Sequence, residues 1–334
     1  MSIRIFKQIY FRLPIFIRLL VVIFLLMFLF GGLIHIVEPT QFPSIFDGVW
    51  WAFVTGATVG YGDFVPLTAT GKIVAICLIL TGGGLIAFYI TSLSAATIQH
   101  EKDLAQGKLP FKGSNHLILI GWNERTRQLI EIISTSSVHI RMVLIDTTLD
   151  HVSFPDYPVH FIQGDPSEDR ILEKANIKLA ERVLITADIT KKERDADNHS
   201  ILTAVAIRGN NAKIPIIVEI LSSIQIDNAH RAGATTILRS NDFTSALFYH
   251  ELSRETKARP FEDIYHILTT QQFHHATLPE ELENVSFGEA AAIHRKSQQI
   301  LLGIIRNSTY YINPTSKFIL KKDDVLIGLI PWND

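Results

Sequence analysis

The residues from Thr58 to Asp63 read Thr-Val-Gly-Tyr-Gly-Asp, and their types and order could form a binding site for a cation. An extended loop of this kind can point consecutive backbone carbonyls at one axis, where their oxygens replace the water around a dehydrated cation. Carbonyls that face one way require backbone angles that residues with a Cβ atom resist, and Gly60 and Gly62 have none. We therefore expect an ion site built from the backbone oxygens of Thr58, Val59, Gly60, Tyr61 and Gly62.

Two apolar segments flank this loop and must position it. Leu19 to Val37 and Ile73 to Ala96 are each long enough to cross a bilayer as a helix. Between them, Pro43 to Gly71 is too polar for a third crossing, and Phe46 to Gly56 is predicted to be a short helix leading into the loop. Re-entrant backbone of this kind is tolerated where protein buries it or water reaches it. A basic flank places the N-terminus in the cytoplasm by the positive-inside rule: Arg4, Lys7, Arg12 and Arg18.

Charge divides the 334 residues into a membrane third and a soluble two-thirds. The charged side chains between residues 19 and 99 are Glu38, Asp47, Asp63 and Lys72. The net charge of −2 argues against a nucleic-acid binder, which usually has a basic excess. The single cysteine, Cys77, excludes a disulfide within the chain and a metal site made of cysteines.

Residues 15 to 100 resemble the pore of two-transmembrane potassium channels, because the loop is joined by Trp50 and Trp51, which match the aromatic pair of that family's pore helix. The resemblance implies K⁺ in a selectivity filter and a homotetramer embedded in membrane lipid. It also implies a hydrogen bond from Trp50 to Asp63 that braces the filter. Val54 stands where some members carry a glutamate that pairs with this aspartate, so their inactivation behaviour is not carried over.

Gly82, Gly83 and Gly84 lie within the second apolar segment. Each glycine costs about 1 kcal/mol relative to alanine in a helix interior. Two interpretations remain open: small residues let membrane helices pack closely, and a gating hinge needs a few permissive residues. The resemblance places the family's hinge at Gly82.

From His116 onward the sequence alternates short apolar strands with helices, which predicts a doubly wound parallel sheet over residues 115–255. The predicted strands are His116 to Ile120, Arg141 to Ile145, Val159 to Ile162, Val183 to Thr186, Ile216 to Glu219 and Thr236 to Leu238. Ligands of such sheets bind beyond the carboxyl ends of the strands.

The first strand is followed by a turn, Gly121 to Thr126, at the place of a dinucleotide-binding turn. Asn123 and Thr126 stand where that fingerprint has glycine, so the match is incomplete. Asp146 ends the second strand, where an acidic residue would bind ribose hydroxyls. A turn that only joins a strand to a helix is the alternative.

Residues 115 to about 255 resemble the regulator-of-K⁺-conductance (RCK) domain, a Rossmann-like fold. The turn after the first strand and Gly164-Asp165-Pro166 are similar to those of its calcium-gated members. The resemblance implies that NAD(H), ATP or ADP binds through Gly121, Asn123, Glu124, Arg125, Asp146 and Asp165.

The same resemblance implies a site for Ca²⁺ or another divalent cation. Asp188 and Glu219 match two of the family's three carboxylates, and Leu221, which cannot ligate, stands at the third. Because calcium takes several oxygen ligands, the departure at Leu221 puts the site in doubt. An ordinary loop acid and an ordinary strand-end acid are the alternative.

Residues 256–334 are predicted to hold dimerisation helices and a small α+β subdomain, with strands Ile300 to Arg306 and Val325 to Ile330. This segment resembles the C-terminal subdomain of the same regulators, across whose dimer cyclic di-AMP binds in some relatives. The implied ligand residues are Ile305, Arg306, Asn313 and Pro314. A β-hairpin with an Asn-Pro turn is the alternative.

The leading hypothesis is a ligand-gated K⁺ channel of the cell membrane. Its pore (1–100) would be pulled through a linker (101–114) by cytoplasmic RCK dimers that form a gating ring, with or without additional soluble RCK subunits. A membrane-anchored nucleotide oxidoreductase would explain the sheet but not the loop, and no nucleophile or acid–base pair lies near Gly121, so we expect no enzyme. A regulatory subunit of a K⁺ uptake system responding to adenine nucleotides or cyclic di-AMP is a further alternative, although it would not need its own pore.

Overall fold

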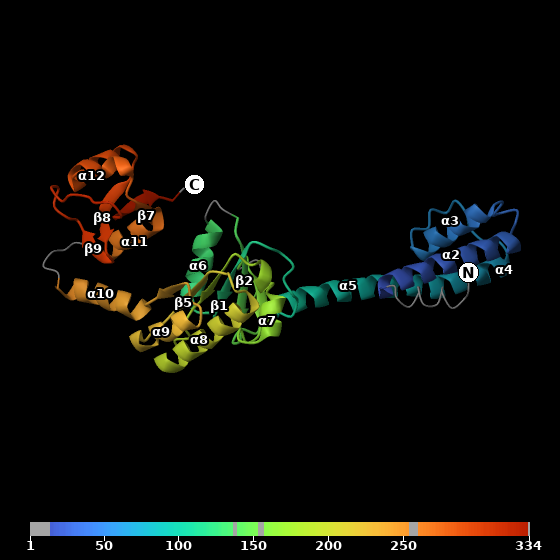
Figure 1. Ribbon diagram of the computed structural model, residues 1–334. Helices are drawn as coiled ribbons and strands as arrows, with labels where there is room; N and C mark the ends of the chain where they lie inside the picture. The colour runs from blue at the N-terminus through green and yellow to red at the C-terminus, as the bar shows by residue number, and fades with distance from the viewer. Residues whose placement is uncertain (1–13, 136–138, 153–156, 254–259, 333–334) are drawn as a thin grey trace. The chain divides into compact units, whose positions relative to one another are not determined.

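The computed structural model describes residues 14–135, 139–152, 157–253 and 260–332 (Figure 1). The chain divides into two compact units, Met1–Leu109 with Asp150–Ser153, and Pro110–Leu149 with Phe154–Asp334. The first unit contains the predicted pore, and the second contains both sheets.

The first unit is helical. Two helices are long and apolar enough to cross a membrane: α2 (Ile15–Val37), and the continuous helix made of α4 (Ala69–Leu78), η1 (Ile79–Gly83) and α5 (Gly84–Ala105). The shorter α3 (Ile45–Gly56) lies between them in sequence and packs beside α2, in blue in Figure 1. The predicted helices are confirmed. The second apolar helix, however, ends at Ala105 rather than Ala96, so it includes residues expected to form a connector.

Glycine allows α3 to approach α2 closely. A Cβ atom on Gly48 would come within 2.2 Å of the carbonyl oxygen of Gly31. Small residues that bring backbones together are a common way for membrane helices to associate. α3 begins with a capping box, in which the Ser44 hydroxyl accepts from the Asp47 amide at 3.1 Å and the Asp47 carboxylate accepts from the Ser44 amide at 3.0 Å.

Glu38 joins the end of α2 to the start of α4. Its carboxylate accepts hydrogen bonds from the amides of Leu67 at 3.0 Å and Thr68 at 2.8 Å, and the residue is 4% exposed. Thr68 is the N-cap of α4, and its hydroxyl accepts from the amide of Gly71. The re-entrant segment is therefore fixed both where it leaves the first crossing helix and where it enters the second.

The second unit begins with a six-stranded parallel sheet in the order β3-β2-β1-β4-β5-β6. Its strands are β1 (His116–Ile120), β2 (Arg141–Asp146), β3 (His160–Gln163), β4 (Arg182–Ile185), β5 (Ile216–Glu219) and β6 (Thr236–Leu238). All six predicted strands are confirmed, with small differences at some ends. The connecting helices are α6 (Glu124–Thr135), α7 (Asp169–Lys174), α8 (Glu193–Asn210) and α9 (Ile226–Arg231).

The order of this sheet fixes where a ligand cleft can form. The chain leaves β1 toward β2 on one side and later returns to β4 on the other, so a crevice opens between the carboxyl ends of β1 and β4. Fully buried side chains from neighbouring strands, including Ile118, Val143 and Val183, form the core beneath it.

The C-terminal part carries α10 (Ser240–Ser253), α11 (Pro260–Thr270) and a four-stranded antiparallel sheet in the order β7-β10-β8-β9. Its strands are β7 (Gln271–Thr277), β8 (Ile300–Arg306), β9 (Thr309–Ile312) and β10 (Val325–Pro331). Helix α12 (Phe287–Lys296) covers one face, where Phe287 and Ala290 share a core with Ile304 and Leu326. The predicted α+β subdomain is confirmed.

The alternative of a β-hairpin with an Asn-Pro turn is wrong about the turn. β8 and β9 are joined by Asn307 and Ser308, whose φ angles are 48° and 62°. Two successive residues with positive φ make the tight turn whose twist matches that of paired strands. Asn313 and Pro314 follow β9 instead, where the missing amide hydrogen of proline costs no hydrogen bond of the sheet.

His116 is a buried histidine at the start of β1. Its Nε2 donates to the carbonyl oxygen of Ala175 at 2.9 Å, while in the described part of the chain Nδ1 has no partner. Burial lowers the pKa of His116, and the nearby positive charges of Arg141 and His160 lower it further, against the opposing effect of the bond to Ala175.

Acid should therefore weaken this domain through His116. The unfolded chain binds the proton at its ordinary pKa of about 6.5 and the folded chain at a lower one, so stability is lost as pH falls below about 6.5. We expect the melting temperature of the full chain in detergent to drop less between about pH 7.5 and about pH 5.5 in His116→Gln, which keeps a donor for Ala175, than in the unsubstituted chain. The exposed control His230→Gln should keep the full drop, and equal drops in both variants would contradict the assignment.

Candidate functional site: the re-entrant loop and the ligand cleft

The loop after α3 adopts the backbone that its glycines were expected to allow. Gly60 and Gly62 have φ angles of +60° and +80°, and nothing lies within 4 Å of a Cβ atom built on either. Thr58 also has a positive φ of 58°, which is uncommon for a β-branched residue and is found mainly at functional sites. The amides of Val59 and Gly60 donate to the carbonyl oxygen of Val54, at 3.0 Å and 3.3 Å, and so attach the loop to the end of α3.

Trp50 supports the loop from the side. Its indole nitrogen donates to the carboxylate of Asp63 at 2.8 Å, which is the hydrogen bond that the sequence led us to expect. The same indole stacks on the ring of Tyr61, with centroids 6.0 Å apart and planes 7° apart. The side chain of Val54 offers no hydrogen bond, so Trp50 bears this contact with Asp63.

Gly82 lies in a π-helical turn, not in a break. Residues Ile79–Gly83 form η1, and Gly82 is its buried residue. A Cβ atom on Gly82 would lie 3.0 Å from Leu78 Cδ1 and 3.1 Å from Met27 Cε, so close packing on α2 is one reason for glycine here. Single π-turns inside α-helices are also frequent at functional sites. The hinge at Gly82 stays a prediction.

A cavity of about 220 Å³ lies in the crevice between β1 and β4. Gly121 at its edge has a φ of +93°, and a Cβ atom there would lie 2.7 Å from the hydroxyl of Thr186. The side-chain amide of Asn123 donates to that hydroxyl at 3.0 Å. The Thr126 hydroxyl donates to the carbonyl oxygen of Gly121 at 2.8 Å. The dinucleotide fingerprint has glycines here, which leave the backbone accessible to a phosphate. In this turn, hydrogen-bonded side chains occupy that position instead.

Asp146 is engaged with the protein itself. One carboxylate oxygen accepts from the amide of Trp122 at 2.7 Å, and the other accepts from the amide and hydroxyl of Thr148, both at 2.6 Å, and from the amide of Leu149 at 3.0 Å. The residue is 7% exposed. Asp146 therefore shapes the cleft, and a ribose would have to compete with these bonds.

The structure brings only part of the predicted nucleotide set to this cavity. Gly121, Asn123 and Asp146 line it, whereas Glu124, Arg125 and Asp165 are not among the lining residues. Exposed Glu124 is bound to Arg127, and this hydrogen bond lowers the Glu124 pKa to about 2. The sequence analysis assigned Asp188 to a metal site and left other lining residues unassigned, although the rule about the carboxyl ends of strands points to this edge of the sheet. Among them are Trp122, Thr148, Ile189, Lys191 and, from helix α8, His199.

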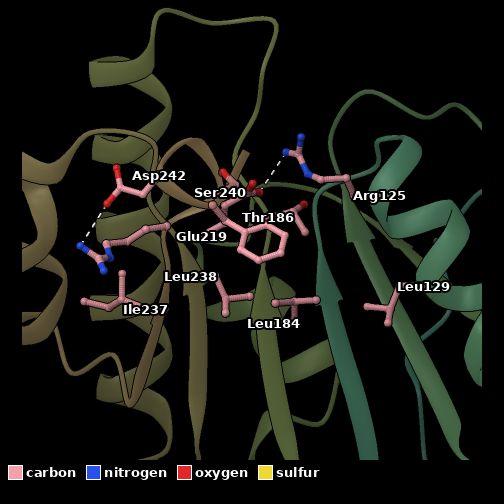
Figure 2. Close-up of a pocket in the computed structure, with 11 residues that line it drawn as sticks. Arg125, Leu129, Leu184, Thr186, Glu219, Ile237, Leu238, Ser240 and Asp242 are labelled. Atoms are coloured by element: carbon pink, nitrogen blue, oxygen red, sulfur yellow. Dashed lines mark hydrogen bonds and ion pairs between the residues drawn. The ribbon is translucent and has the colours of Figure 1, made fainter. Parts of the chain in front are cut away.

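A second cavity, of about 630 Å³, lies beside β4, β5 and β6 (Figure 2). Leu129, Leu184 and Leu238 contribute apolar side chains to it, and its charged groups are paired with each other. Arg125 donates to Glu219 at 2.9 Å, and Arg239 lies 3.0 Å from the carboxylate of Asp242.

The two carboxylates predicted to bind a divalent cation have partners already. Glu219 accepts from Arg125 and, at 2.8 Å, from the amide of Ala187, and its side chain is 5% exposed. Asp188 accepts from the hydroxyl of Thr190, which lowers its pKa, and lies 3.3 Å from Lys191 Nζ. Within the described residues, no group of three or more His, Cys, Asp or Glu side chains could hold a metal ion. The divalent-cation site stays a prediction, and both of its predicted carboxylates are already bonded to other groups of the protein.

In the C-terminal subdomain, Arg306 is committed to the buried carboxylate of Asp324. Its Nε and Nη2 donate to the two oxygens, both at 2.7 Å, and the guanidinium lies 4.8 Å from the centre of the Phe318 ring. Burial opposes ionisation of Asp324, but the bonds from Arg306 outweigh it and hold the pKa of Asp324 down. Ile305 precedes Arg306 on β8, and Asn313 donates its amide to the carbonyl oxygen of Leu302 at 2.8 Å. The ligand role predicted for these residues and for Pro314 stays a prediction.

A re-entrant loop between two membrane-length helices, joined to a Rossmann-type domain, defines a membrane channel with a regulatory domain. Two family models match the chain: "Ion channel" over residues 22–99 and "TrkA-N domain" over residues 117–240. The putative potassium channel protein YugO of Bacillus subtilis is 39% identical over 321 residues, which cover 95% of this chain and 97% of YugO. This chain belongs to the family of potassium channels that carry a TrkA-N (RCK) regulatory domain.

More distant relatives agree with this assignment. The calcium-gated potassium channel TvoK of Thermoplasma volcanium is 30% identical over 220 residues, which cover 65% of this chain and 62% of TvoK. The solved structure of the GsuK channel bound to NAD has a similar fold, with a TM-score of 0.52 at 16% identity. That match covers 94% of this chain and 56% of GsuK, so the present chain spans little more than half of that channel's length.

Removing the indole donor should weaken the loop from Thr58 to Asp63. Trp50→Phe keeps a ring beside Tyr61 but leaves Asp63 without this partner, and a hydrogen bond to a charged group contributes about 1.5–3 kcal/mol. We expect the K⁺ current of the variant in planar bilayers to decline at least about tenfold faster under a maintained voltage, since about 1.4 kcal/mol corresponds to a factor of ten in rate. Trp51→Phe, whose ring packs on Phe42 instead, is the matched control, and equal decline in both variants would count against a bracing role for Trp50.

Proposed function

We propose that four copies of this chain surround a K⁺-selective pore whose filter is made by Thr58 to Gly62, and that a nucleotide bound in the regulatory domains opens or closes it. The observation that carries this proposal is the re-entrant loop, because one chain supplies only one wall of the carbonyl cage that K⁺ needs. Val59 and Tyr61 are 54% and 68% exposed in the single chain, in keeping with neighbours that cover them in a tetramer.

The proposed layout follows the order of the chain. Residues 1–100 form the pore, 101–114 the linker, 115–255 the RCK domain, and 256–334 the dimerisation helices and C-terminal subdomain. The basic N-terminal flank supports a cytoplasmic N-terminus, and a chain that crosses twice then returns its regulatory domain to the cytoplasm. Helix α5 continues to Ala105, so helix reaches into the linker and gives a stiff element through which force could reach Gly82.

A nucleotide is better supported than a divalent cation as the ligand. The cavity of about 220 Å³ between β1 and β4 is in the place where Rossmann-type sheets bind nucleotides. GsuK, whose fold this chain shares, is a channel described as bound to NAD. Against a cation, Glu219 is neutralised by Arg125 and Leu221 carries no oxygen, although TvoK is named a calcium-gated channel.

Assembly of the regulatory domains into a ring is supported by the exposed apolar side chains of α10. Phe243, Phe248, Tyr249 and Leu252 are exposed on this helix in the single chain. Large exposed apolar patches mark interaction sites, so we assign α10 to pairing between RCK domains. A ring completed by extra soluble subunits would need a start other than Met142, which lies inside β2.

The filter assignment is tested by Gly60→Ala. An alanine at a φ of +60° is strained, and its methyl group changes the loop that should line the pore. We expect K⁺ flux into liposomes to fall at least about a hundredfold while nucleotide affinity is unchanged, since the cleft lies in the other unit. Gly32→Ala, where a Cβ atom has nothing within 4 Å, is the matched control and should retain flux. Normal flux in Gly60→Ala would refute the assignment of the filter to this loop.

The ligand class is tested by thermal shifts of the full chain in detergent with NAD⁺, NADH, ADP, ATP, cyclic di-AMP and Ca²⁺. A nucleotide in the cleft should raise the melting temperature, and the rise should shrink in Lys191→Glu at the cavity wall but persist in Glu219→Gln. A rise with Ca²⁺ that is lost in Glu219→Gln, with none for nucleotides, would make this a divalent-gated channel. A rise with cyclic di-AMP that Arg306→Gln removes would move the sensor to the C-terminal subdomain.

A further inference from the structure

The cleft between β1 and β4 is lined by two large apolar side chains that the dinucleotide fingerprint does not explain. Trp122, from the loop after β1, and Ile189, from the loop after β4, both line it. Ile189 is 60% exposed, although isoleucine is among the residues most often fully buried. Trp122 is the lining residue with a large aromatic side chain.

Trp122 is held in place from two sides. Its amide donates to the buried carboxylate of Asp146 at 2.7 Å. Its ring makes an edge-to-face contact with Tyr157, with centroids 5.0 Å apart and planes 79° apart. A side chain fixed before the ligand arrives loses little conformational entropy on binding, which favours affinity.

Ile189 is held by the turn that contains it. The carboxylate of Asp188 accepts from the amide of Thr190 at 3.0 Å and from its hydroxyl, and the carbonyl oxygen of Asp188 accepts from the amide of Lys191 at 3.2 Å. Lys191 also pairs with the Asp188 carboxylate at 3.3 Å. These bonds fix the loop so that the isoleucine lies at the cavity wall with most of its surface open to solvent.

We infer that the planar ring of the bound nucleotide stacks on the indole of Trp122 and is covered by the side chain of Ile189. This inference rests on the nucleotide site proposed above and names the residues that recognise its ring. Stacking accepts any flat ring because every base has a π-face. The turn at Gly121 is closed by Asn123 and Thr186, so the ring, and not the phosphate, is the part of the ligand that the loop after β1 holds.

The size of the cavity limits what it encloses. Its volume of about 220 Å³ lies below the about 300–1,000 Å³ of pockets that surround a whole drug-sized ligand. We therefore expect the cavity to enclose one ring and its sugar, with the remainder of a dinucleotide lying outside it.

NADH is the probe for this arrangement, because it absorbs light where tryptophan emits. We expect NADH to quench the tryptophan emission of the full-length channel in detergent, and Trp122→Phe to reduce that quenching. Trp332→Phe, which removes an exposed tryptophan of the C-terminal subdomain, should leave the quenching as it is. Calorimetry should give a Kd for NADH that rises about tenfold in Trp122→Ala, since base stacking is lost, and about fivefold in Ile189→Thr.

The outcomes separate this inference from the proposal on which it rests. If NADH binds the unsubstituted channel, but Trp122→Ala and Ile189→Thr bind it equally well and Trp122→Phe is quenched normally, ring recognition by Trp122 is wrong and the nucleotide site stands. If neither NADH nor ADP binds the unsubstituted channel, both fail. Should Trp122→Ala melt at a lower temperature, Trp122→Phe decides, because it keeps a ring against Tyr157 while removing the indole.

Discussion

The structure depends on holding an irregular loop of backbone at membrane depth, where unpaired peptide groups cannot bond to water. A loop whose carbonyls are to bind an ion, as we propose for Thr58 to Gly62, cannot also use them to stabilise itself, so the surrounding residues must fix it. Trp50 does so through Asp63 on one side, and the carbonyl oxygen of Val54 receives two loop amides on the other. Glu38 secures the returning end at Thr68. The loop and its returning end are thus held at three places, all within residues 38–68.

In the regulatory domain, too, bonds within the protein fix the loops around a candidate site. In the cleft between β1 and β4, Asp146 is already bonded to Trp122 and Thr148. In the second cavity, Glu219 is already bonded to Arg125 and Ala187. These bonds leave few unused oxygens for a divalent cation. They also fix the two loops that present Trp122 and Ile189, so a ligand meets a surface that is ordered in advance.

Much of this could be predicted from the sequence, for a physical reason. The filter motif, both crossing helices and all six strands of the parallel sheet are local patterns in which residue type follows backbone geometry. The prediction of an Asn-Pro turn was wrong. Proline indicates where a strand ends, but it does not identify the turn that joins the two strands of the hairpin. Asn307 and Ser308 do so through two positive φ angles. The length of the second crossing helix was also underestimated, because charged residues after His100 ended the apolar pattern but not the helix.

The sequence by itself determined that this chain has a potassium-channel loop, a membrane third and a Rossmann-like sheet, because each is written in neighbouring residues. Only the tertiary structure decided which polar side chains are free to act. Glu219 stays a predicted metal ligand, but the fold places Arg125 beside it, and Arg306, which is predicted to contact a ligand, is paired with Asp324. The two residues of these pairs lie 94 and 18 positions apart in the sequence, so no local sequence pattern predicts that they meet. Whether a charged group is available depends on what folding brings next to it.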